Sequence, residues 1–505
     1  MSGKTLMVQG TASNVGKSIL VTALCRIFKN DGFTVAPFKA QNMSLNSFVT
    51  PDGGEIGRAQ AVQAEAAGIA PTVDMNPILL KPEANSRSQV VVRGHPQQST
   101  GAAAYYQLKS QLWPVVTQAL DTLRSQYQIV VIEGAGSPAE INLTKDEIVN
   151  MRVARYCQAP VLLVGDIDRG GVFASLLGTL GLLNPEDLAL VKALVINKFR
   201  GDPALFEPGI RFIEEKANLP VAGVIPYFND ISIAQEDSVA LEQSASQPTS
   251  FQVDIAVIRL PHISNFDDFD PLAKENGIRV RYVNFNKNLE HPDLIILPGS
   301  KTTVADLDWL SESGLADGIT ELYQHGSFVI GVCGGYQMLG RFIDDPEQVE
   351  SAVLRRPGLG LLPITTTFLP TKETHQVKGE VVSCRGLLAK TRGIRFKGYE
   401  IHMGRTESDE EGTAFRLKER SGEPCDVSDG YLDSSGRVLG TYIHGLFRDK
   451  KLRRAILSQI AQSKGQRLNF KDNRREDEYD KLADLVSNSL NMELIYTIAG
   501  LSKGS

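Results

Sequence analysis

Short apolar runs, each followed by a helical pattern, recur along most of this chain and limit the folds that it can adopt. The first half contains TLMVQG, QIVVIEGAG, APVLLVGD, VKALVINK and LPVAGVIP, and the second half contains VDIAVIRLP, DLIILPGS and SFVIGVCGG. Continuous apolar runs of this length are typical of parallel strands that are buried on both faces. Their alternation with helical segments predicts an α/β fold built from doubly wound parallel sheets.

A polar stretch rich in Ser and Gln, EDSVALEQSASQPTSFQ, separates the two series of strands. Because 505 residues are too many for one hydrophobic core, this stretch favours a domain boundary near residues 240–250. We therefore predict a first domain over residues 1–240 and a second over residues 251–447. The charged segments after these, RRAILSQIAQ and YDKLADLVSNSL, have helical periodicity and predict a helical tail over residues 448–505.

Composition excludes several classes of function. A net charge of -6 with a pI near 5.8 disfavours nucleic-acid binding, which normally requires a basic face. The sequence starts directly with a strand pattern rather than a signal peptide, and no apolar run reaches membrane-spanning length. The chain has five cysteines, and their spacing is not that of metal ligands: they are Cys25, Cys157, Cys333, Cys384 and Cys425. Their odd number favours a reducing compartment over a set of disulfides. We therefore expect a cytoplasmic protein without nucleic-acid or membrane partners.

The segment LMVQGTASNVGKSILVTALCRIF combines an apolar strand, a glycine-bearing loop, a Gly-Lys-Ser triplet and an amphipathic helix. This order predicts a phosphate loop that binds ATP, in which Lys17 reaches the terminal phosphates and the Ser18 hydroxyl binds Mg²⁺. Five residues separate Gly10 from Gly16, one more than in the strict motif. The variant resembles the loop of dethiobiotin synthetase and its relatives. The predicted ATP contacts in the loop are Gly10, Thr11, Asn14, Gly16, Lys17 and Ser18.

Two other strand ends carry candidate ATP-site residues. Glu133 closes the run IVVIE at the edge where α/β folds bind ligands and metals, and we predict that it shares the Mg²⁺ with Ser18. Asn197 and Lys198 follow the run VKALVI and are predicted to contact the nucleotide. The alternatives are a solvated carboxylate and an ordinary surface turn with a solvated lysine.

Basic and amide side chains gather in PFKAQNMSLNSF and KPEANSRSQVVVRG, also near strand ends. Arginine and lysine in such places can neutralise a substrate rich in carboxylates, although each alone is more often a surface charge. The predicted substrate residues are Lys39, Gln41, Asn42 and Arg87, with Lys81 and Arg93 nearby in sequence.

The segment GVCGGYQMLG places Cys333 between glycines directly after an apolar strand. This pattern indicates a nucleophile elbow, in which the helix N-terminus below the sulfur favours the thiolate; a buried cysteine that only packs is the alternative. A nucleophilic thiol needs a base, and His444 follows a later apolar strand in LGTYIHGLF. Backbone N–H groups at Gly334 and at Gly299, in the LPGS turn, are the predicted oxyanion donors.

The G-x-C-G-G-Y-Q pattern with a late Y-I-H-G resembles the class I glutamine amidotransferase domains. Joined to a dethiobiotin-synthetase-like ATP domain, it resembles the cobyric acid synthase family over roughly residues 1–447, and FKAQNMSLNS, EGAGSPAEINL, RPGLGLLP and GYEIHMGRT are similar to sequences of that family. The resemblance implies a ligase that uses glutamine, ATP and Mg²⁺ to amidate the b, d, e and g carboxylates of a corrinoid, adenosylcobyrinic acid a,c-diamide.

Two other families remain as alternatives. A cobyrinic acid a,c-diamide synthase has the same combination of an ATP domain and an amidotransferase domain, and it acts on other carboxylates. A partitioning-type P-loop ATPase is a binding protein of a different class, but it usually carries an extra lysine at the start of the loop, and GTASNVGKS has none there.

Two departures from the resembled patterns leave residue roles open. Many class I amidotransferases have His-x-Glu, whereas His444 is followed here by Gly445 and Leu446, so the group that orients the imidazole is unassigned and Glu400 is one candidate. Glu147 stands where the resemblance suggests an aspartate, which leaves the roles of Asp146 and Glu147 open.

Overall fold

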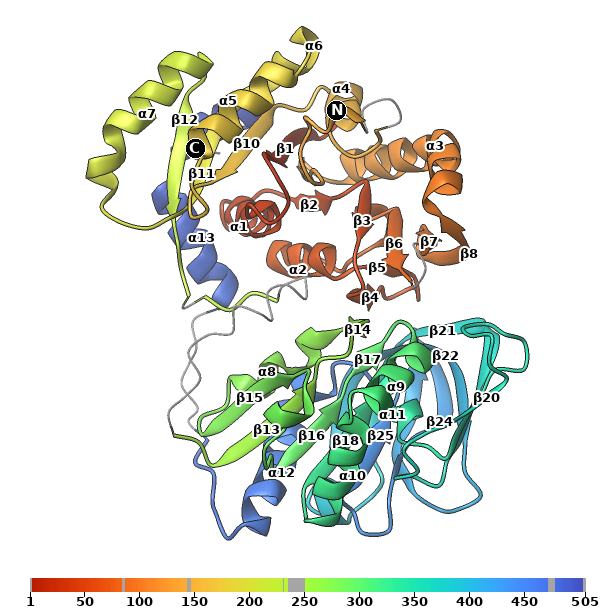
Figure 1. Cartoon of the computed structure of the whole chain (residues 1–505). Helices are drawn as coiled ribbons and strands as arrows, with labels where there is room; N and C mark the ends of the chain where they lie inside the picture. The colour runs from red at the N-terminus through yellow and green to blue at the C-terminus, as the bar shows by residue number, and fades with distance from the viewer. Residues whose placement is uncertain are drawn as a thin grey trace.

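The computed structural model describes residues 2–83, 87–142, 147–229, 231–234, 250–470 and 477–502. The polypeptide forms two α/β bodies (Figure 1), and the first and last elements of the described chain, β1 (Lys4–Gly10) and α14 (Met492–Ala499), both belong to the first one. The α/β class predicted from the apolar runs is confirmed. The predicted linker lies largely outside the described residues.

The first body is built on a six-stranded sheet in which every pair of neighbouring strands is parallel. Alternate side chains of its central strand enter opposite cores: Met7 packs on one face, and Leu6 and Val8 pack on the other. Burial on both faces explains the unbroken apolar runs in the sequence. In spatial order the strands are β12 (Val221–Pro226), β11 (Val191–Phe199), β10 (Val161–Asp166), β1 (Lys4–Gly10), β9 (Ile129–Glu133) and β2 (Val35–Phe38).

Helices cover both faces of this sheet (Figure 1). They are α1 (Lys17–Asn30), α2 (Arg58–Ala67), α3 (Ala102–Gln126), α4 (Met151–Cys157), α5 (Val172–Leu182), α6 (Pro185–Leu188) and α7 (Pro203–Ala217), with a 3-10 turn η1 (Val73–Met75).

Two small sheets of the first body face the second body (Figure 1). One has four strands in the order β3 (Gln41–Met43), β6 (Ile78–Pro82), β7 (Arg87–Val92) and β8 (His95–Gly101), and the other is the hairpin of β4 (Ser47–Val49) and β5 (Glu55–Gly57). They carry several of the predicted substrate residues to the boundary between the bodies.

The second body has an eleven-stranded mixed sheet. Its parallel part runs β15 (Ile278–Val283), β13 (Val253–Ile258), β16 (Leu294–Leu297), β18 (Phe328–Val332) and β25 (Val438–Thr441). It continues through β24 (Glu423–Leu432), β23 (Thr413–Arg420), β21 (Thr365–Val381), β19 (Phe342–Asp344) and β20 (Arg355–Pro357), while β22 (Arg395–Glu407) pairs with β21. This largely antiparallel extension was not predicted, because its strands alternate buried and exposed residues instead of forming apolar runs.

Helices and short elements complete the second body. They are η4 (Phe266–Phe269), α8 (Asp270–Ala273), η5 (Asn286–Asn288), α9 (Thr303–Glu312), α10 (Leu315–Gln324), α11 (Gly334–Met338), η6 (Gly386–Leu388), η7 (Leu446–Arg448) and α12 (Lys450–Ser463), with the strand pair β14 (Ile263–Ser264) and β17 (Gly299–Ser300).

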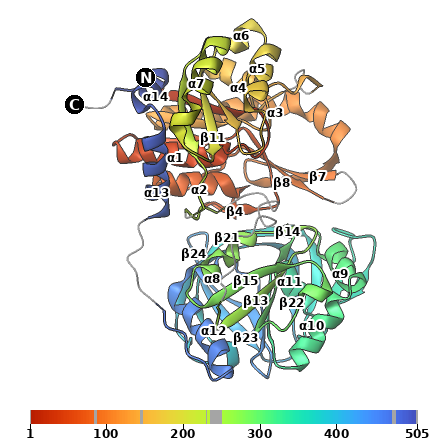
Figure 2. The same cartoon turned by 60° about the vertical axis from the view of Figure 1, so that its left-hand side comes forward.

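The described part of the chain after residue 448 contains helices, as the periodicity predicted, but these helices serve both bodies. Leu452 and Ile456 of α12 are buried in a core of the second body. The next two helices, α13 (Glu478–Ser489) and α14 (Met492–Ala499), lie against the first body (Figure 2). Leu482 and Ile495 are fully buried there beside the central sheet.

Among the described residues, no helix combines the length and the apolar character that crossing a membrane requires.

Candidate active site

Cys333 stands on a strained turn between β18 and α11. Its φ of 52° and ψ of −110° lie in a region that residues other than glycine rarely adopt. The turn also needs its glycines: a Cβ at Gly335 would lie 2.0 Å from the carbonyl oxygen of Leu297, and one at Gly331 would lie 2.6 Å from the carbonyl oxygen of Gly335. The structure therefore has the geometry of a nucleophile elbow at Cys333.

Neighbouring parallel strands bring Cys333 and His444 together. β18 pairs with β25, the backbone N–H of Cys333 donates to the carbonyl oxygen of Thr441 at 2.8 Å, and His444 follows shortly after β25. Both side chains line a cavity of about 480 Å³, and Lys81 and Arg87 of the first body line its wall. The cavity therefore lies at the boundary between the two bodies.

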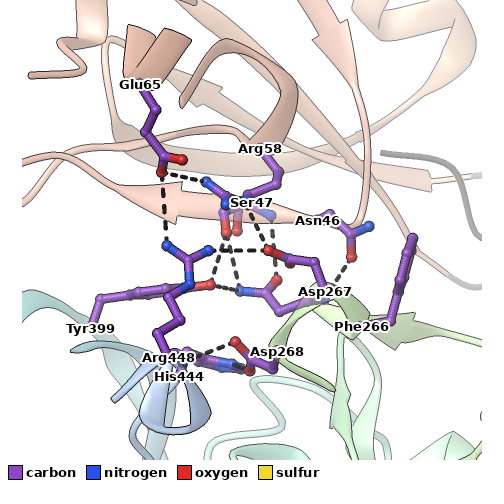
Figure 3. A network of polar contacts seen from close by, with 12 residues as sticks. Asn46, Ser47, Arg58, Glu65, Phe266, Asp267, Asp268, Tyr399, His444 and Arg448 are labelled. Atoms are coloured by element: carbon purple, nitrogen blue, oxygen red, sulfur yellow. Dashed lines mark hydrogen bonds and ion pairs between the residues drawn. The ribbon is translucent and has the colours of Figure 1, made fainter. Parts of the chain in front are cut away.

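Asp268 contacts His444 at the ring nitrogen Nδ1. The carboxylate lies 2.6 Å from Nδ1 of His444 and accepts the backbone N–H of Gly445 at 2.9 Å (Figure 3). Both side chains are almost fully buried, and Nε2 of His444 has no hydrogen-bond partner among the described residues. Burial would lower the pKa of His444, but the Asp268 carboxylate and the nearby Cys333 thiol raise it, which favours the imidazolium that pairs with a thiolate.

Glu400, the candidate that sequence offered for orienting the imidazole, has a different role. It forms an ion pair with Arg420 at 2.7 Å. Its neighbour Tyr399 instead stacks on His444, with ring centroids 5.2 Å apart. Successive residues of a strand point to opposite sides, so Tyr399 and Glu400 cannot both face the ring. The Glu400 hypothesis is therefore wrong, and Asp268 takes this position.

The two glycines predicted as oxyanion donors lie beside the thiol and the imidazole. A Cβ at Gly334 would lie 3.0 Å from the backbone nitrogen of Ser300, and one at Gly299 would lie 3.2 Å from Cε1 of His444. The turn after β16 and the start of α11 thus approach each other closely at the elbow.

The phosphate loop of the first body connects β1 to α1. Gly16 has a φ of 102°, a left-handed conformation that glycine adopts without strain. Gly10 is also required, because a Cβ there would lie 2.5 Å from the Val15 side chain. The Thr11 N–H donates to strand β10 at 2.9 Å, and Lys17 Nζ donates to two backbone carbonyls, those of Ala12 at 2.8 Å and Gly136 at 3.1 Å. The Lys17 side chain therefore lies over the loop, with its ammonium group bound to backbone carbonyls.

Asn197 and Lys198, at the end of β11, hold this loop from the side. The Asn197 amide donates to the Val15 carbonyl at 2.8 Å, and a Cβ at Gly16 would lie 2.0 Å from the same nitrogen. Lys198 Nζ donates to the Asn14 carbonyl at 2.7 Å. The structure thus shows these two side chains shaping the loop, and their contact with the nucleotide stays a prediction.

Glu133 is the centre of a buried polar cluster at the end of β9. Its Oε1 accepts Ser18 Oγ and Lys39 Nζ, each at 2.8 Å, and its Oε2 accepts the Gln63 amide at 2.6 Å. Burial would raise the pKa of Glu133, but Lys39 and the hydrogen bonds from Gln63 and Ser18 hold it below its ordinary value. A carboxylate beside a hydroxyl at the phosphate loop is a donor set that fits Mg²⁺, which takes few protein ligands and completes its shell with phosphate and water.

The predicted substrate residues do not form one cluster. Lys39 lies on Glu133, the Asn42 amide donates to Gln60 at 3.1 Å, and Gln41 accepts the Tyr105 hydroxyl at 2.5 Å. Arg87 instead lies in the wall of the cavity that contains Cys333. Lys39 is thus at the predicted ATP site and Arg87 is on the side of the thiol, while Gln41 and Asn42 contact other residues of the first body.

Two known families match the two bodies in turn. Residues 6–241 match the CobQ/CobB/MinD/ParA nucleotide binding domain, and residues 254–452 match the CobB/CobQ-like glutamine amidotransferase domain. The cobyric acid synthase of Dehalococcoides mccartyi is 55% identical over 498 residues, which cover 98% of each chain. The cobyric acid synthase of Desulfitobacterium hafniense is 48% identical over 522 residues, or 100% of each chain, and that of Moorella thermoacetica is 49% identical over 99% of this chain and 98% of its own.

The chain belongs to the cobyric acid synthase family. The resemblance read from the cysteine and histidine motifs is thereby confirmed, as are the nucleotide-binding and glutamine amidotransferase classes of the two bodies.

Sequence reasoning missed Asp268 although the chain carries a signal for it. The segment NFDDFDPL follows the apolar run VDIAVIRLP and contains three aspartates near a strand end. Such a cluster alone does not show which carboxylate meets a histidine far away in sequence. The sequence also left the roles of Glu147 and Asp146 open. Glu147 accepts the backbone N–H of Arg152 at 3.0 Å, at the start of α4, and Asp146 lies outside the described residues.

Other residues that were missed join the bodies beside the cavity. Glu55 of the first body is fully buried and pairs with Lys81 at 2.7 Å and with Lys372 of the second body at 2.6 Å. Glu83 pairs across the boundary with Lys301 at 2.8 Å. These ion pairs hold the first body against the wall of the thiol cavity.

Proposed function

We propose that this protein amidates the b, d, e and g carboxylates of adenosylcobyrinic acid a,c-diamide, using ATP and glutamine. The observation that carries the proposal is the combination of two chemically different sites in one chain that matches cobyric acid synthases from end to end. A glutamine amidotransferase domain and membership of this family make the chain a glutamine-dependent amidating ligase.

In the proposed glutaminase reaction, the Cys333 thiolate attacks the side-chain amide carbon of glutamine. The N–H groups of Gly299 and Gly334 stabilise the oxyanion, and His444 gives its proton to the departing ammonia. Water then cleaves the thioester to glutamate, with His444 accepting the proton. Asp268 supports the charged imidazole at 2.6 Å throughout.

In the proposed synthetase reaction, the loop residues Gly10, Thr11, Asn14, Gly16 and Lys17 bind the phosphates of ATP, with Asn197 and Lys198 holding the loop. A substrate carboxylate attacks the γ-phosphorus, ADP leaves, and ammonia displaces phosphate from the acyl phosphate to give the amide. Phosphate leaves far more readily than hydroxide, so ATP is needed for amide formation.

A bound Mg²⁺ would supply charge neutralisation on the phosphates, and Ser18 and Glu133 are the residues that would hold it. We assign Lys39, Gln41, Asn42 and Arg87 to the corrinoid. The synthetase function is assigned to residues 1–240 and the glutaminase function to residues 251–447, and residues 448–505 are assigned as a C-terminal tail that is helical over α12, α13 and α14.

The test supplies purified protein with ATP, Mg²⁺, glutamine and either cobyrinic acid or its a,c-diamide, and follows products by mass spectrometry. The proposal expects the a,c-diamide to gain successive amides until cobyric acid is reached. Conversion of cobyrinic acid only to its a,c-diamide, without reaction of the diamide, would instead identify a cobyrinic acid a,c-diamide synthase.

A further inference from the structure

Helix α2 touches both sites. Its first residue, Arg58, lies at the boundary between the bodies, and Gln63 in its middle donates to Glu133 at 2.6 Å. Five residues of α-helix span only about 7.5 Å, so Arg58 and Gln63 lie less than two turns apart on one hydrogen-bonded helix. Any movement at Glu133 that shifts Gln63 therefore also moves Arg58.

Arg58 is a buried cation whose partner belongs to the other body. Its side chain is 3% exposed, its Nε donates to Asp267 at 2.8 Å, and a second nitrogen donates to Glu65 of its own helix at 3.2 Å (Figure 3). Asp267 is 1% exposed and also contacts Arg448 at 3.2 Å. Burial would raise the pKa of Asp267, but the Arg58 guanidinium holds it below its ordinary value. The charges of this pair are compensated partly within each body, by Glu65 and Arg448, and partly across the boundary, by each other.

Asp267 immediately precedes Asp268, which orients His444. The start of the same short turn is also held from the first body: the backbone N–H of Asn265 donates to the Asn46 side chain at 2.6 Å, and the Asn265 amide donates to the Ser47 carbonyl at 3.0 Å. The turn that places Asp268 is therefore held partly by residues of the synthetase body.

We propose that helix α2 couples the two sites and that Arg58 is a positioning residue for the glutaminase. Occupation of the ATP site changes the bond between Gln63 and Glu133, α2 passes the change to the Arg58–Asp267 pair, and the position of Asp268 on His444 follows. Ammonia is then released efficiently only when the synthetase site is filled. This inference rests on the proposed function.

The test measures glutamate release from glutamine, with and without ATP, Mg²⁺ and the a,c-diamide, in the full-length protein. For the wild type we expect the ligands to raise kcat by about tenfold, a common size for coupling between sites. Arg58→Gln should lose this stimulation with the KM for glutamine unchanged within about twofold, while amidation from added ammonia continues. Arg58→Lys, which retains the charge, should retain part of the stimulation by the ligands.

Two further variants separate positioning from folding. The double variant R58Q/D267N removes both buried charges, so that neither is left uncompensated, and it should fold and lack stimulation as well. Arg356→Gln removes a more exposed arginine–aspartate pair that lies wholly within the second body, where Arg356 contacts Asp308 through two nitrogens at 2.7 Å each, and stimulation should persist. Thermal unfolding verifies that each variant is folded.

A folded Arg58→Gln protein with undiminished stimulation would overturn the inference, and so would equal loss of ammonia-dependent and glutamine-dependent amidation. Absence of stimulation in the wild type would also overturn it. A wild-type protein that amidates nothing, even with ammonia, would instead contradict the proposed function itself.

Discussion

The phosphate-loop site and the thiol site of this protein are assembled in opposite ways. The first is centred on one continuous segment, from β1 through the loop to Ser18, to which Glu133 is added from the adjacent strand β9 and Asn197 from β11, two strands away on the other side. The thiol site has no such segment, because Asp268 and His444 come from distant parts of the sequence and meet Cys333 only in the folded protein. The comparison teaches that a local site can be read from a motif, whereas a dispersed site depends on how the strands are ordered.

The two sites also differ in what holds them. Glu133 is fixed by hydrogen bonds and an ion pair from three side chains, all within the first body. The turn that carries Asp268 is held by contacts from both bodies, as Figure 3 shows. The thiol site should therefore be the more sensitive of the two to the relative position of the bodies.

Removing the thiol should separate the two sites most completely. We expect Cys333→Ala to lower glutamine-dependent amidation by about 10,000-fold or more, since no other group can form the thioester, and to leave ammonia-dependent amidation within about twofold. The measurement is product formation with each nitrogen donor. Cys384→Ala, at an exposed cysteine, is the control that should retain both activities. Equal loss with both donors in folded C333A would contradict independent sites.

Changes in the loop should have the converse effect. Lys17→Ala and Glu133→Gln should lower amidation about 1,000-fold with either donor, because both groups act on ATP and its metal. Basal glutamine hydrolysis without ATP should persist, as measured by glutamate release. Lys192→Ala removes an exposed lysine of the same body and is expected to behave as the wild type. Retained ammonia-dependent turnover in K17A would remove Lys17 from the ATP site.

The assignment of Asp268 over Glu400 is tested by a matched pair of substitutions. Asp268→Asn keeps the shape of the side chain but not the charge that supports the imidazolium, and we expect kcat for glutamine hydrolysis to fall about 100-fold. Glu400→Gln should change it by about threefold or less, since Glu400 pairs with Arg420 and not with His444. The reverse order of effects would restore Glu400 as the orienting group.

The smallest effect expected is on stability, at the strand end that leads to His444. Asp429 is buried, accepts the Thr441 hydroxyl at 2.5 Å, and has its pKa raised to about 6 by burial. The folded state then binds more protons than the unfolded state between about pH 4 and 6, so this stabilising contribution is present at low pH and is lost as the pH rises through 6.

Asp429→Asn should remove this pH dependence, with a difference on the order of 3 kcal/mol across the window. The measurement is the Tm of both proteins from pH 4 to 8, where the Tm of D429N relative to the wild type should increase with pH. A constant difference in Tm would show that Asp429 titrates alike in both states.

Much of the fold could be predicted because parallel strands leave a strong trace in the sequence. Runs such as IVVIE and VLLVGD are buried on both faces, so they are apolar except for the carboxylate at their ends. Strands β21 to β24 were not predicted because one side of each meets solvent or the other body. The tail was predicted to be helical, yet nothing in its periodicity says that α13 returns to the first body.

The sequence by itself determined the phosphate loop, the elbow at Cys333 and the membership of the cobyric acid synthase family. In each case the constraint is local: a left-handed Gly16, a close approach at Gly335, a lysine next to a serine. Only the tertiary structure decided that Asp268 orients His444, that Asn197 and Lys198 hold the loop, and that Arg58 reaches Asp267. The reason is physical: a buried charge is stable only beside its partner, and chain folding, not sequence spacing, determines which partner is near.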